Sequence, residues 1–208
     1  MLYLVKTPWW IKKWVYPDYL WSMPRDQKKM YLTFDDGPHP VATPLALEAL
    51  KKYKASATFF CIGKNVAAHP DIYKQVLSEG HAVGNHTYDH LNGWKISDKK
   101  YFDNILQAAN YIDSRLFRPP YGRITRFQAK QASEKLGLTV VMWSVLSADF
   151  DIEITPQKCW RNVQRSAGNG SVIVFHDSEK AMERMIYALN ETLACFTEQG
   201  FVFEKLGG

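Results

Sequence analysis

Residues 29–38 read KMYLTFDDGP, an apolar run that ends in two carboxylates and a turn. The run Met30–Phe34 is short and apolar, which predicts a buried strand. A Gly-Pro pair follows the carboxylates, and both residue types are typical of turns. The stretch therefore predicts a core strand that brings Asp35 and Asp36 to its carboxyl end.

Strand-like and helix-like segments alternate from this strand to the C-terminus. Further strands are expected at Ala57–Cys61, His81–Gly84, Leu116–Phe117, Leu138–Val145, Ser171–Phe175 and Phe201–Phe203. Helices are expected from Thr43 to Tyr53, over Asp71–Ser78, from Ser97, over Ile124–Leu136, from Thr155, and over Glu179–Glu198. The alternation predicts right-handed βαβ units and a parallel sheet. Polar residues follow most of these strands, which favours a closed barrel with one active face over an open, doubly wound sheet.

Composition excludes several classes of protein. The chain has 208 residues, which predicts one domain or one domain with an extension, and it is 46% hydrophobic, enough for a substantial core. A charged fraction of 23% excludes a disordered chain. The net charge of +5 suits an anionic substrate or surface, and it suits an ordinary soluble enzyme equally well. Because no block of Lys and Arg occurs, we expect no nucleic-acid partner.

The cysteines and apolar runs bear on location. Cys61, Cys159 and Cys195 are odd in number and form no CxxC pair, so free thiols are expected in place of a disulfide framework. No stretch approaches the roughly 20 apolar residues of a membrane span. Lysines and a proline interrupt the first residues, which removes a signal-peptide core. A cytoplasmic location is the default expectation, and the sequence does not indicate the oligomeric state.

Residues 1–28 differ in composition from the rest of the chain. Four of the seven tryptophans lie there, at Trp9, Trp10, Trp14 and Trp21, interleaved with lysines. One interpretation is an interfacial anchor at a membrane surface or a sugar-stacking surface. The favoured interpretation is an aromatic segment packed over the bottom or side of the barrel.

Two motifs at strand ends could hold a metal ion. Asp35 and Asp36 point in divergent directions from one strand end, so one can hold an ion while the other handles a proton, although an Asp-Gly turn alone would look similar. His86 and His90 are four residues apart, which places both on one face of a helical turn. Asp36 is the natural third ligand, and Asp89 is the alternative.

Two further motifs carry an arginine and a histidine. Arg118 begins the segment RPPYG and could hold Asp35 ionised through a charge-assisted hydrogen bond. A backbone N–H near Tyr121 could donate to an oxyanion. His176 ends the sixth strand, where it could act as a general acid, as a third metal-binding histidine, or in a structural role.

Together these segments resemble the polysaccharide deacetylases of the NodB-homology family, carbohydrate esterase family 4. The family pattern is TFDDGP, HxxxH, RPPYG, a segment containing Asp and Trp, and an apolar stretch ending in His-Asp. All but the fourth motif are matched in order, at Thr33–Pro38, His86–His90, Arg118–Gly122 and Val172–Asp177. The match runs from about Lys29 to the C-terminus.

The resemblance implies a distorted (β/α)7 barrel over residues 29–208, preceded by an aromatic-rich extension over residues 1–28. It also implies a role for each matched residue. Asp35 would be the general base, Asp36, His86 and His90 the metal ligands, His176 the general acid, Arg118 the group that orients Asp35, Tyr121 the oxyanion donor, and Val174 and Trp143 the pocket for the acetyl methyl.

The fourth motif departs from the family pattern. Leu146 stands where the first Asp of that motif is expected, and Phe150 replaces the Trp. Leucine cannot accept a hydrogen bond from an imidazole. His176 is therefore expected either to have a lowered pKa or to pair with Asp149 or Asp151 instead.

The function expected from these residues is metal-dependent hydrolysis of N-acetyl groups on an amino-sugar glycan of peptidoglycan or chitin type. Zinc is the default metal, and cobalt, nickel or manganese would suit the same ligands. The expected partner is an N-acetylated oligo- or polysaccharide. The alternatives are a lapsed carbohydrate-binding protein of the same fold, motivated by Leu146, and an O-acetyl esterase.

Overall fold

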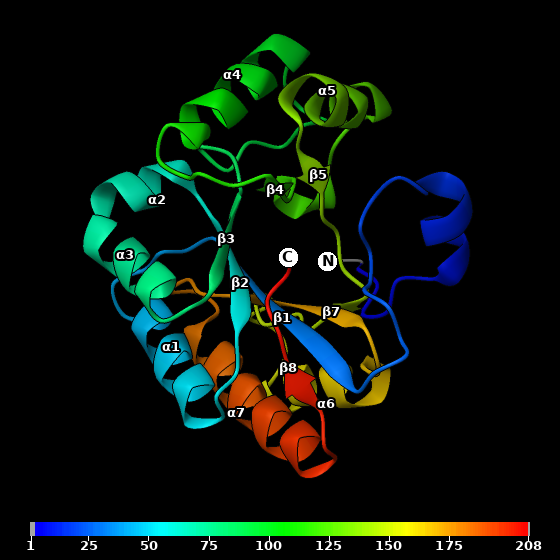
Figure 1. Ribbon diagram of the computed structural model, residues 1–208, viewed down its shortest axis with the longest axis vertical. Coiled ribbons are helices and arrows are strands. Elements are labelled where there is room, and N and C mark those ends of the chain that lie inside the picture. The colour runs from blue at the N-terminus through cyan, green and yellow to red at the C-terminus, as the bar shows by residue number, and fades with distance from the viewer. Residues whose placement is uncertain (1–2, 208) are drawn as a thin grey trace.

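The computed structural model describes residues 3–207, apart from the side chain of Val15, and shows strands ringed by helices (Figure 1). The strands are β1 (Lys29–Asp35), β2 (Ala57–Cys61), β3 (Ala82–Asn85), β4 (Leu116–Phe117), β5 (Thr139–Val140), β6 (Val145–Leu146), β7 (Ser171–His176) and β8 (Val202–Phe203). The α-helices are α1 (Ala42–Lys52), α2 (Gly63–Ala68), α3 (Pro70–Ser78), α4 (Asp98–Ala109), α5 (Arg126–Leu136), α6 (Pro156–Ser166) and α7 (Met182–Glu198). A π-helical turn spans Ile11–Val15, and a 3-10 turn spans Pro120–Gly122.

Strand β1 lies near the middle of a parallel sheet with the order β5-β4-β3-β2-β1-β7-β6. Asp35 is in register with Phe60 of β2 and with His176 of β7. The carboxyl ends of these strands are therefore level, and the polar residues that follow them share one face. Strand β8 pairs with the first residues of β1. The fold is the distorted (β/α)7 barrel expected from the sequence.

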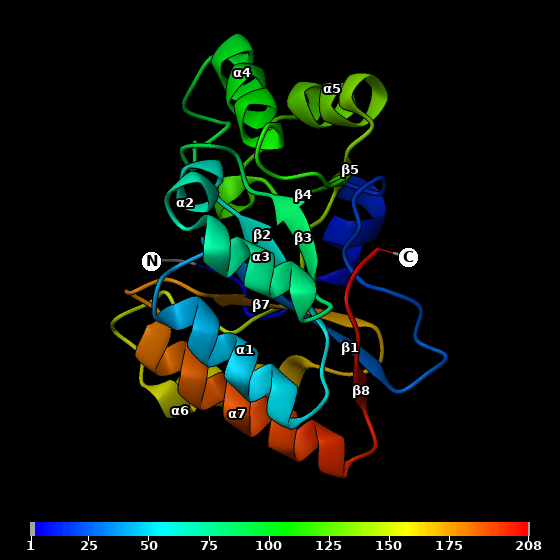
Figure 2. The same ribbon diagram turned by 60° about the vertical axis from the view of Figure 1, so that its left-hand side comes forward.

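Apolar side chains fill both the layer between strands and helices and the barrel interior. Every residue of β1 after Lys29 is buried, as a strand covered on both faces requires. Figure 2 shows α1, α6 and α7 gathered at the bottom of the view and α4 and α5 at the top, so the helices lie around the outside of the strands. Inside the barrel, Leu206 of the C-terminal tail packs among Tyr31, Phe60, Val141 and Val172. The tail therefore closes the barrel from within.

The structure corrects the expected fifth strand, Leu138–Val145. Two short strands occupy this stretch, with β5 pairing to β4 and β6 pairing to β7. The chain breaks between them because two of its carbonyls, those of Val141 and Met142, accept hydrogen bonds from the guanidinium of Arg118. These carbonyls are used by a buried charge and not by a neighbouring strand.

Helix boundaries also differ in places. The short helix α2 was not expected, since its sequence GKNVAA has no apolar period. Helix α7 begins at Met182 and not at Glu179, because a turn in which Ala181 donates to the carbonyl of Ser178 precedes it. Helix α5 begins after Thr125, which forms a capping box with Gln128.

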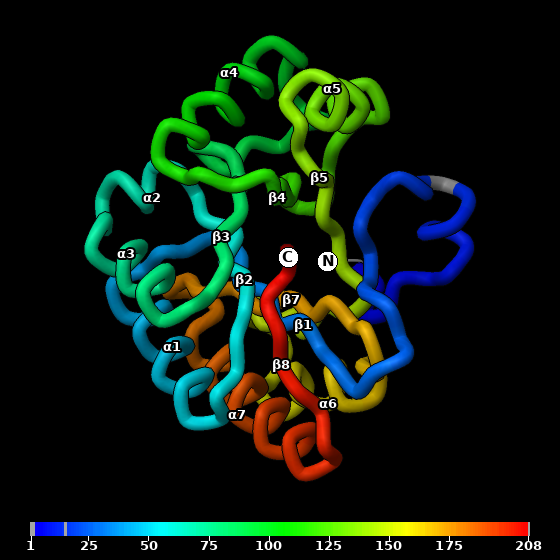
Figure 3. The backbone as a smooth tube through the Cα atoms, viewed as in Figure 1, coloured from blue at the N-terminus to red at the C-terminus, as the bar shows by residue number. Residues whose placement is uncertain are grey.

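The N-terminal extension lies along the side of the barrel and hydrogen-bonds to it (Figure 3). Lys6 forms a bridge with β6, Leu20 forms a bridge with the residue after β5, and Ser22 forms a bridge with the first residue of β7. Trp21 is 7% exposed. The interpretation of the extension as a packed segment is therefore confirmed for Trp21. The other three tryptophans behave differently.

Candidate active site

A cleft of about 670 Å³ opens at the carboxyl ends of the strands. The sequence-derived candidates that line it are Asp35, Asp36, His86, His90, Tyr121, Trp143, Val174 and His176. Arg118 lies below the cleft floor and is fully buried. The fold therefore brings together residues that are far apart in the chain, as the register of Asp35 on β1 with His176 on β7 illustrates.

The carboxylate of Asp35 is held by a buried arginine. Arg118 donates through Nη1 to Oδ1 of Asp35 at 2.7 Å and to the hydroxyl of Thr33 at 2.7 Å. The guanidinium also lies over the ring of Phe60, 4.1 Å from its centroid. These partners fix the guanidinium in one orientation, and it in turn fixes Asp35. The expected pairing of Arg118 with Asp35 is confirmed.

Asp36 turns away from Asp35 and faces two histidines. Its φ of 83° lies in the left-handed region, which reverses the chain between the two carboxylates. The side chain of Asn65 holds this turn by donating to the carbonyl of Asp36 at 2.7 Å. Oδ1 of Asp36 lies 3.2 Å from Nε2 of His90 and 3.7 Å from Nε2 of His86.

The two histidines do not share a helical turn as expected. They lie in the loop after β3, where His90 has a φ of 58° and Thr87 a φ of 62°. Loop residues in this strained region cluster at functional sites. The loop brings both rings to Asp36, whereas the alternative ligand Asp89 turns away and accepts a hydrogen bond from Asn104.

Hydrogen bonds on the far side of each imidazole orient the ligand atoms. Nδ1 of His86 lies 2.7 Å from the carbonyl of Arg118. A carbonyl can only accept, so Nδ1 carries the proton and Nε2 presents a lone pair to Asp36. Nδ1 of His90 contacts the hydroxyl of Tyr121 at 3.1 Å. Outer partners of this kind hold metal-binding histidines in orientation.

The three side chains fit a small divalent cation. Their candidate ligand atoms all lie within 4.8 Å of one another. Oδ1 of Asp36 is buried and has no hydrogen-bond partner among the described residues, although a buried carboxylate oxygen normally has one. Two imidazole nitrogens and one carboxylate oxygen are a ligand set that zinc and similar ions accept.

The charge states of these ligands suit a cation as well. Burial would raise the pKa of Asp36, but the contact with His90 and the charge of His176 outweigh burial and hold the pKa well below its usual range. Burial lowers the pKa of His86 to about 4, because the attraction of Asp35 and Asp36 does not compensate for lost hydration. At neutral pH Asp36 is therefore a carboxylate and His86 a neutral imidazole.

His176 faces the cleft from the end of β7 with a buried partner. Its Nδ1 lies 2.7 Å from Oδ1 of Asp149, and its backbone N–H donates to Oδ2 at 2.8 Å. Burial would lower the pKa of His176, but the charge and hydrogen bond of Asp149 dominate and raise it to about 9. The imidazole is therefore protonated at neutral pH. The expectation of a lowered pKa is wrong, and the alternative pairing with Asp149 is confirmed.

This chain resembles known proteins over most of its length. The family model described as Polysaccharide deacetylase matches residues 22–141. Over 189 residues the chain is 36% identical to a peptidoglycan-N-acetylglucosamine deacetylase of Bacillus cereus, with 88% of each protein covered. The chain belongs to the polysaccharide deacetylase family.

Two further members of the family agree with this assignment. A chitooligosaccharide deacetylase of Azorhizobium caulinodans is 32% identical over 200 residues, which cover 88% of this chain and 94% of that protein. A crystal structure of a peptidoglycan N-acetylglucosamine deacetylase bound to 4-naphthalen-1-yl-N-oxidanyl-benzamide has a TM-score of 0.87 and 32% identity, and the match covers 96% and 95% of the two chains. The family, fold and enzyme class expected from the sequence are thereby confirmed.

The departure from the family's fourth motif falls on the cleft wall. Leu146 is in register with Val174, and both line the cleft beside Trp143. Phe150 packs its ring edge-on against His176, 5.2 Å between centroids. The motif therefore supplies an apolar wall at Leu146, and its later residues cover and hold the imidazole.

The sequence did not single out several groups around the cleft. Lys95, Arg123 and Lys180 line the cleft, and Tyr3 reaches it from the extension. Tyr3 donates to Asp151 at 2.7 Å, whereas His176 pairs with Asp149. No periodicity or motif marks isolated cations or a tyrosine near the terminus, so only the folded chain places them here.

The position of Asp177 was also not anticipated from the sequence. It is fully buried behind β1, where it accepts from the backbone of Gly37 at 3.0 Å and from the hydroxyl of Thr43 at 2.5 Å. Burial raises its pKa to about 8. A Cβ on Gly37 would lie 2.0 Å from Oδ2 of Asp177, so only glycine fits there. The His-Asp pair of the last motif thus also fixes the turn that presents Asp36.

Proposed function

We propose that the chain is a metal-dependent hydrolase that removes N-acetyl groups from an amino-sugar glycan and releases acetate. The observation that carries this proposal is the convergence of three groups on one cleft. They are the ligand set around Asp36, the carboxylate of Asp35 held by Arg118, and the protonated imidazole of His176 held by Asp149. Each group suits one requirement of amide hydrolysis.

Asp36, His86 and His90 would hold the cation. A divalent ion bound there supplies Lewis acidity toward the acetyl carbonyl. Zinc is the default choice, and cobalt, nickel or manganese are compatible with the same donors. Two observations support the assignment: the buried oxygen of Asp36 that has no hydrogen bond, and the tautomer of His86 that is fixed by the carbonyl of Arg118.

The remaining residues move protons and position the substrate. Asp35 accepts a proton from the attacking water while the water oxygen forms a bond to the carbonyl carbon. His176 donates a proton to the amide nitrogen as the C–N bond breaks, which leaves acetate and a free amine. The backbone N–H of Tyr121 is the proposed donor to the developing oxyanion, and the φ of 61° at Tyr121 sets the direction of that peptide.

The cleft wall and mouth suit a particular class of glycan. Val174, Leu146 and Trp143 form the apolar surface against which the acetyl methyl would rest. Lys95, Arg123 and Lys180 line the cleft, whose only acidic groups among the described residues are the inner pair Asp35 and Asp36. Such a charge distribution attracts anionic ligands. We therefore place a carboxylate-bearing peptidoglycan strand ahead of neutral chitin oligomers.

Acetate release from N-acetylated peptidoglycan fragments and chito-oligosaccharides tests the proposal. Protein is assayed after chelation and again after zinc, cobalt, nickel or manganese is restored. We expect turnover only with metal, and a lower KM for the carboxylate-bearing fragments at low salt. An ester substrate run in parallel separates amide hydrolysis from O-acetyl ester hydrolysis.

Two variants locate the chemistry within the cleft. Asp35→Asn should retain metal and lose turnover by about 10²–10⁴-fold, the usual contribution of a general base. Asp89→Asn is the matched control, because Asp89 lies in the neighbouring loop but faces Asn104. If Asp35→Asn hydrolyses as fast as the wild type, the assigned base is wrong. Metal binding without turnover on any substrate would instead favour the lapsed, sugar-binding alternative.

A further inference from the structure

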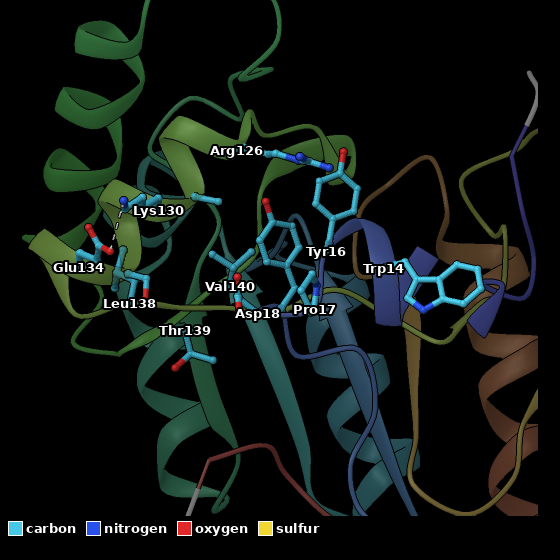
Figure 4. A pocket seen from close by; sticks show the side chains of 13 residues that line it. Trp14, Tyr16, Pro17, Asp18, Arg126, Lys130, Glu134, Leu138, Thr139 and Val140 are labelled. Atoms are coloured by element: carbon cyan, nitrogen blue, oxygen red, sulfur yellow. Dashed lines mark ion pairs between the residues drawn. The ribbon is translucent and has the colours of Figure 1, made fainter. Parts of the chain in front are cut away.

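The aromatic residues of the N-terminal extension fall into two groups. Tyr16, Tyr19 and Trp21 stack on one another, with 5.0 Å between the first two ring centroids, and Trp21 is buried. This stack holds the extension on the barrel. Figure 4 shows Arg126 of α5 extending toward the ring of Tyr16, while Trp14 lies apart from these residues.

The second group is exposed and does not contribute to the core. Trp9 is 63% exposed, Trp10 47% and Trp14 68%. Trp9 and Trp14 contact each other edge to face, 5.0 Å between centroids, so they form one local cluster. A cluster of exposed apolar side chains is typical of a binding surface, whereas apolar residues exposed singly are common on any protein.

The same segment is cationic. Residues 3–17 contain Lys6, Lys12 and Lys13 and no Asp or Glu. Partial burial lowers the pKa of Lys12, and the charges of Arg25 and Lys6 lower it further, which shows that these cations lie close together. The exposed indoles therefore share a short stretch with three lysines and no acidic residue, and Asp18 follows directly after it.

The geometry disfavours a sugar as the occupant. Stacking of a sugar ring requires an accessible flat aromatic face, but Trp9 and Trp14 meet at 68°, which presents no common platform. The neighbouring groove of about 690 Å³ offers Tyr16, whose faces are taken by Tyr19 and by Arg126, 6.0 Å from the ring centroid. Neither surface therefore offers a flat aromatic platform shared by two rings.

We propose that Trp9, Trp10 and Trp14, together with Lys6, Lys12 and Lys13, form a docking patch that binds the surface of an anionic lipid membrane. Indoles partition into the headgroup region of a bilayer, and lysines are attracted to anionic headgroups. The contact is peripheral, since no helix among the described residues is long and apolar enough to cross a membrane. Tyr3, in the same segment, lines the catalytic cleft, so docking places that flank of the cleft beside the membrane.

Sedimentation of the full chain with lipid vesicles tests the docking patch. Vesicles of phosphatidylcholine are compared with vesicles that also contain phosphatidylglycerol, at low and high salt. We expect binding to the anionic vesicles, weakened by salt. Each lysine near an anionic surface contributes about 1 kcal/mol, which is about fivefold in partitioning, so Lys6→Gln/Lys12→Gln/Lys13→Gln should lower binding roughly 100-fold.

Matched variants distinguish the effect of the docking patch from the effect of lysines or exposed aromatic residues elsewhere on the surface. Lys51→Gln/Lys52→Gln/Lys54→Gln removes the same charge from exposed lysines near the end of α1 and should bind as the wild type does. Trp9→Ala/Trp14→Ala should lose most binding even to anionic vesicles. Phe127→Ala, which removes an aromatic side chain 55% exposed on α5, should not. Turnover and the thermal transition of every variant report whether it folds.

Several outcomes would overturn the proposal. These are a failure of the folded wild type to bind anionic vesicles, equal binding to neutral vesicles, and equal loss in the two lysine triples. A fourth is retention on insoluble peptidoglycan or chitin that depends on Trp9 and Trp14, with no vesicle binding, which would assign the patch to a glycan. None of these readings depends on whether the chain deacetylates sugars, so failure of the docking patch and failure of the enzymatic proposal are distinguishable.

Discussion

Replacing Asp149 by asparagine should shift the pH dependence of turnover. His176 must be protonated to donate a proton, so activity is present below its pKa and is lost as pH rises through it. With Asp149 in place this pKa is raised from 6.5 to about 9. Asparagine keeps the size of the side chain but removes the charge, which leaves burial to lower the pKa against the smaller attraction of Asp36 and Asp35. We therefore expect the alkaline limb of the kcat profile to move from about 9 toward 6.5.

The size of the effect follows from the fraction of His176 that is protonated. At pH 8 this fraction falls from about 0.9 to about 0.03 when the pKa moves from about 9 to 6.5, which is about thirtyfold in rate. At pH 6 most of the imidazole stays protonated in both proteins, so any residual loss there reports altered positioning. Asparagine also loses one of two contacts, because its amide nitrogen cannot accept from the ring or the backbone N–H of His176.

The assay is acetate release between pH 5 and about 10, the interval that contains both pKa values, with the same metal bound to each protein. Asp151→Asn serves as the control, because its carboxylate partners Tyr3 and not His176. If the alkaline limb of Asp149→Asn coincides with that of the wild type, Asp149 does not set the pKa of the acid. A shift in both variants would point to a general change in surface charge.

Three other substitutions follow from the geometry. His86→Ala should weaken metal binding by at least roughly 100-fold, because loss of a ligand costs more than loss of a residue that only orients a ligand. Elemental analysis after dialysis should find little metal, and full occupancy would contradict the ligand assignment. Gly37→Ala places a Cβ 2.0 Å from Oδ2 of Asp177 and should lower the free energy of unfolding by about 1–3 kcal/mol, whereas Gly168→Ala, with nothing within 4 Å, should leave the thermal midpoint unchanged. Leu146→Asp should lower kcat/KM by about tenfold, because it puts a carboxylate in the apolar wall; a rise in kcat/KM would mean that the family's first Asp has a role here.

Much of the fold follows from local sequence, because buried parallel strands are continuous apolar runs. Met30–Phe34 and Ser171–Phe175 fall within β1 and β7, and the register that joins them levels Asp35 with His176. The split of the expected fifth strand has no local signal. It depends on the guanidinium of Arg118, which comes from the loop after β4 and takes the carbonyls that would have continued the ladder.

The candidate site shows the same division between local and distant information. The motifs pointed to Asp36, His86 and His90, because residue types and their spacing can be read from the sequence alone. They misjudged how the histidines reach Asp36, since the left-handed φ values of the loop are set by its packing. The partner of His176 was open between two aspartates, and only the folded structure, in which Asp149 contacts both the ring and the backbone N–H of His176, decides between them.

The extension that bridges β5, β6 and β7 has a consequence for folding during synthesis. Thr7 leaves the ribosome early, yet its hydroxyl donates to a carbonyl 136 residues further along the chain. At about 5–20 residues per second, that partner appears on the order of ten seconds later. Until then the backbone groups of the extension that pair with β6 and β7 have no partner, and such long-range pairing is slow to form. The residues of the extension are therefore made long before their partners, and the bridges that join the extension to β6 and β7 form only after those strands have been made.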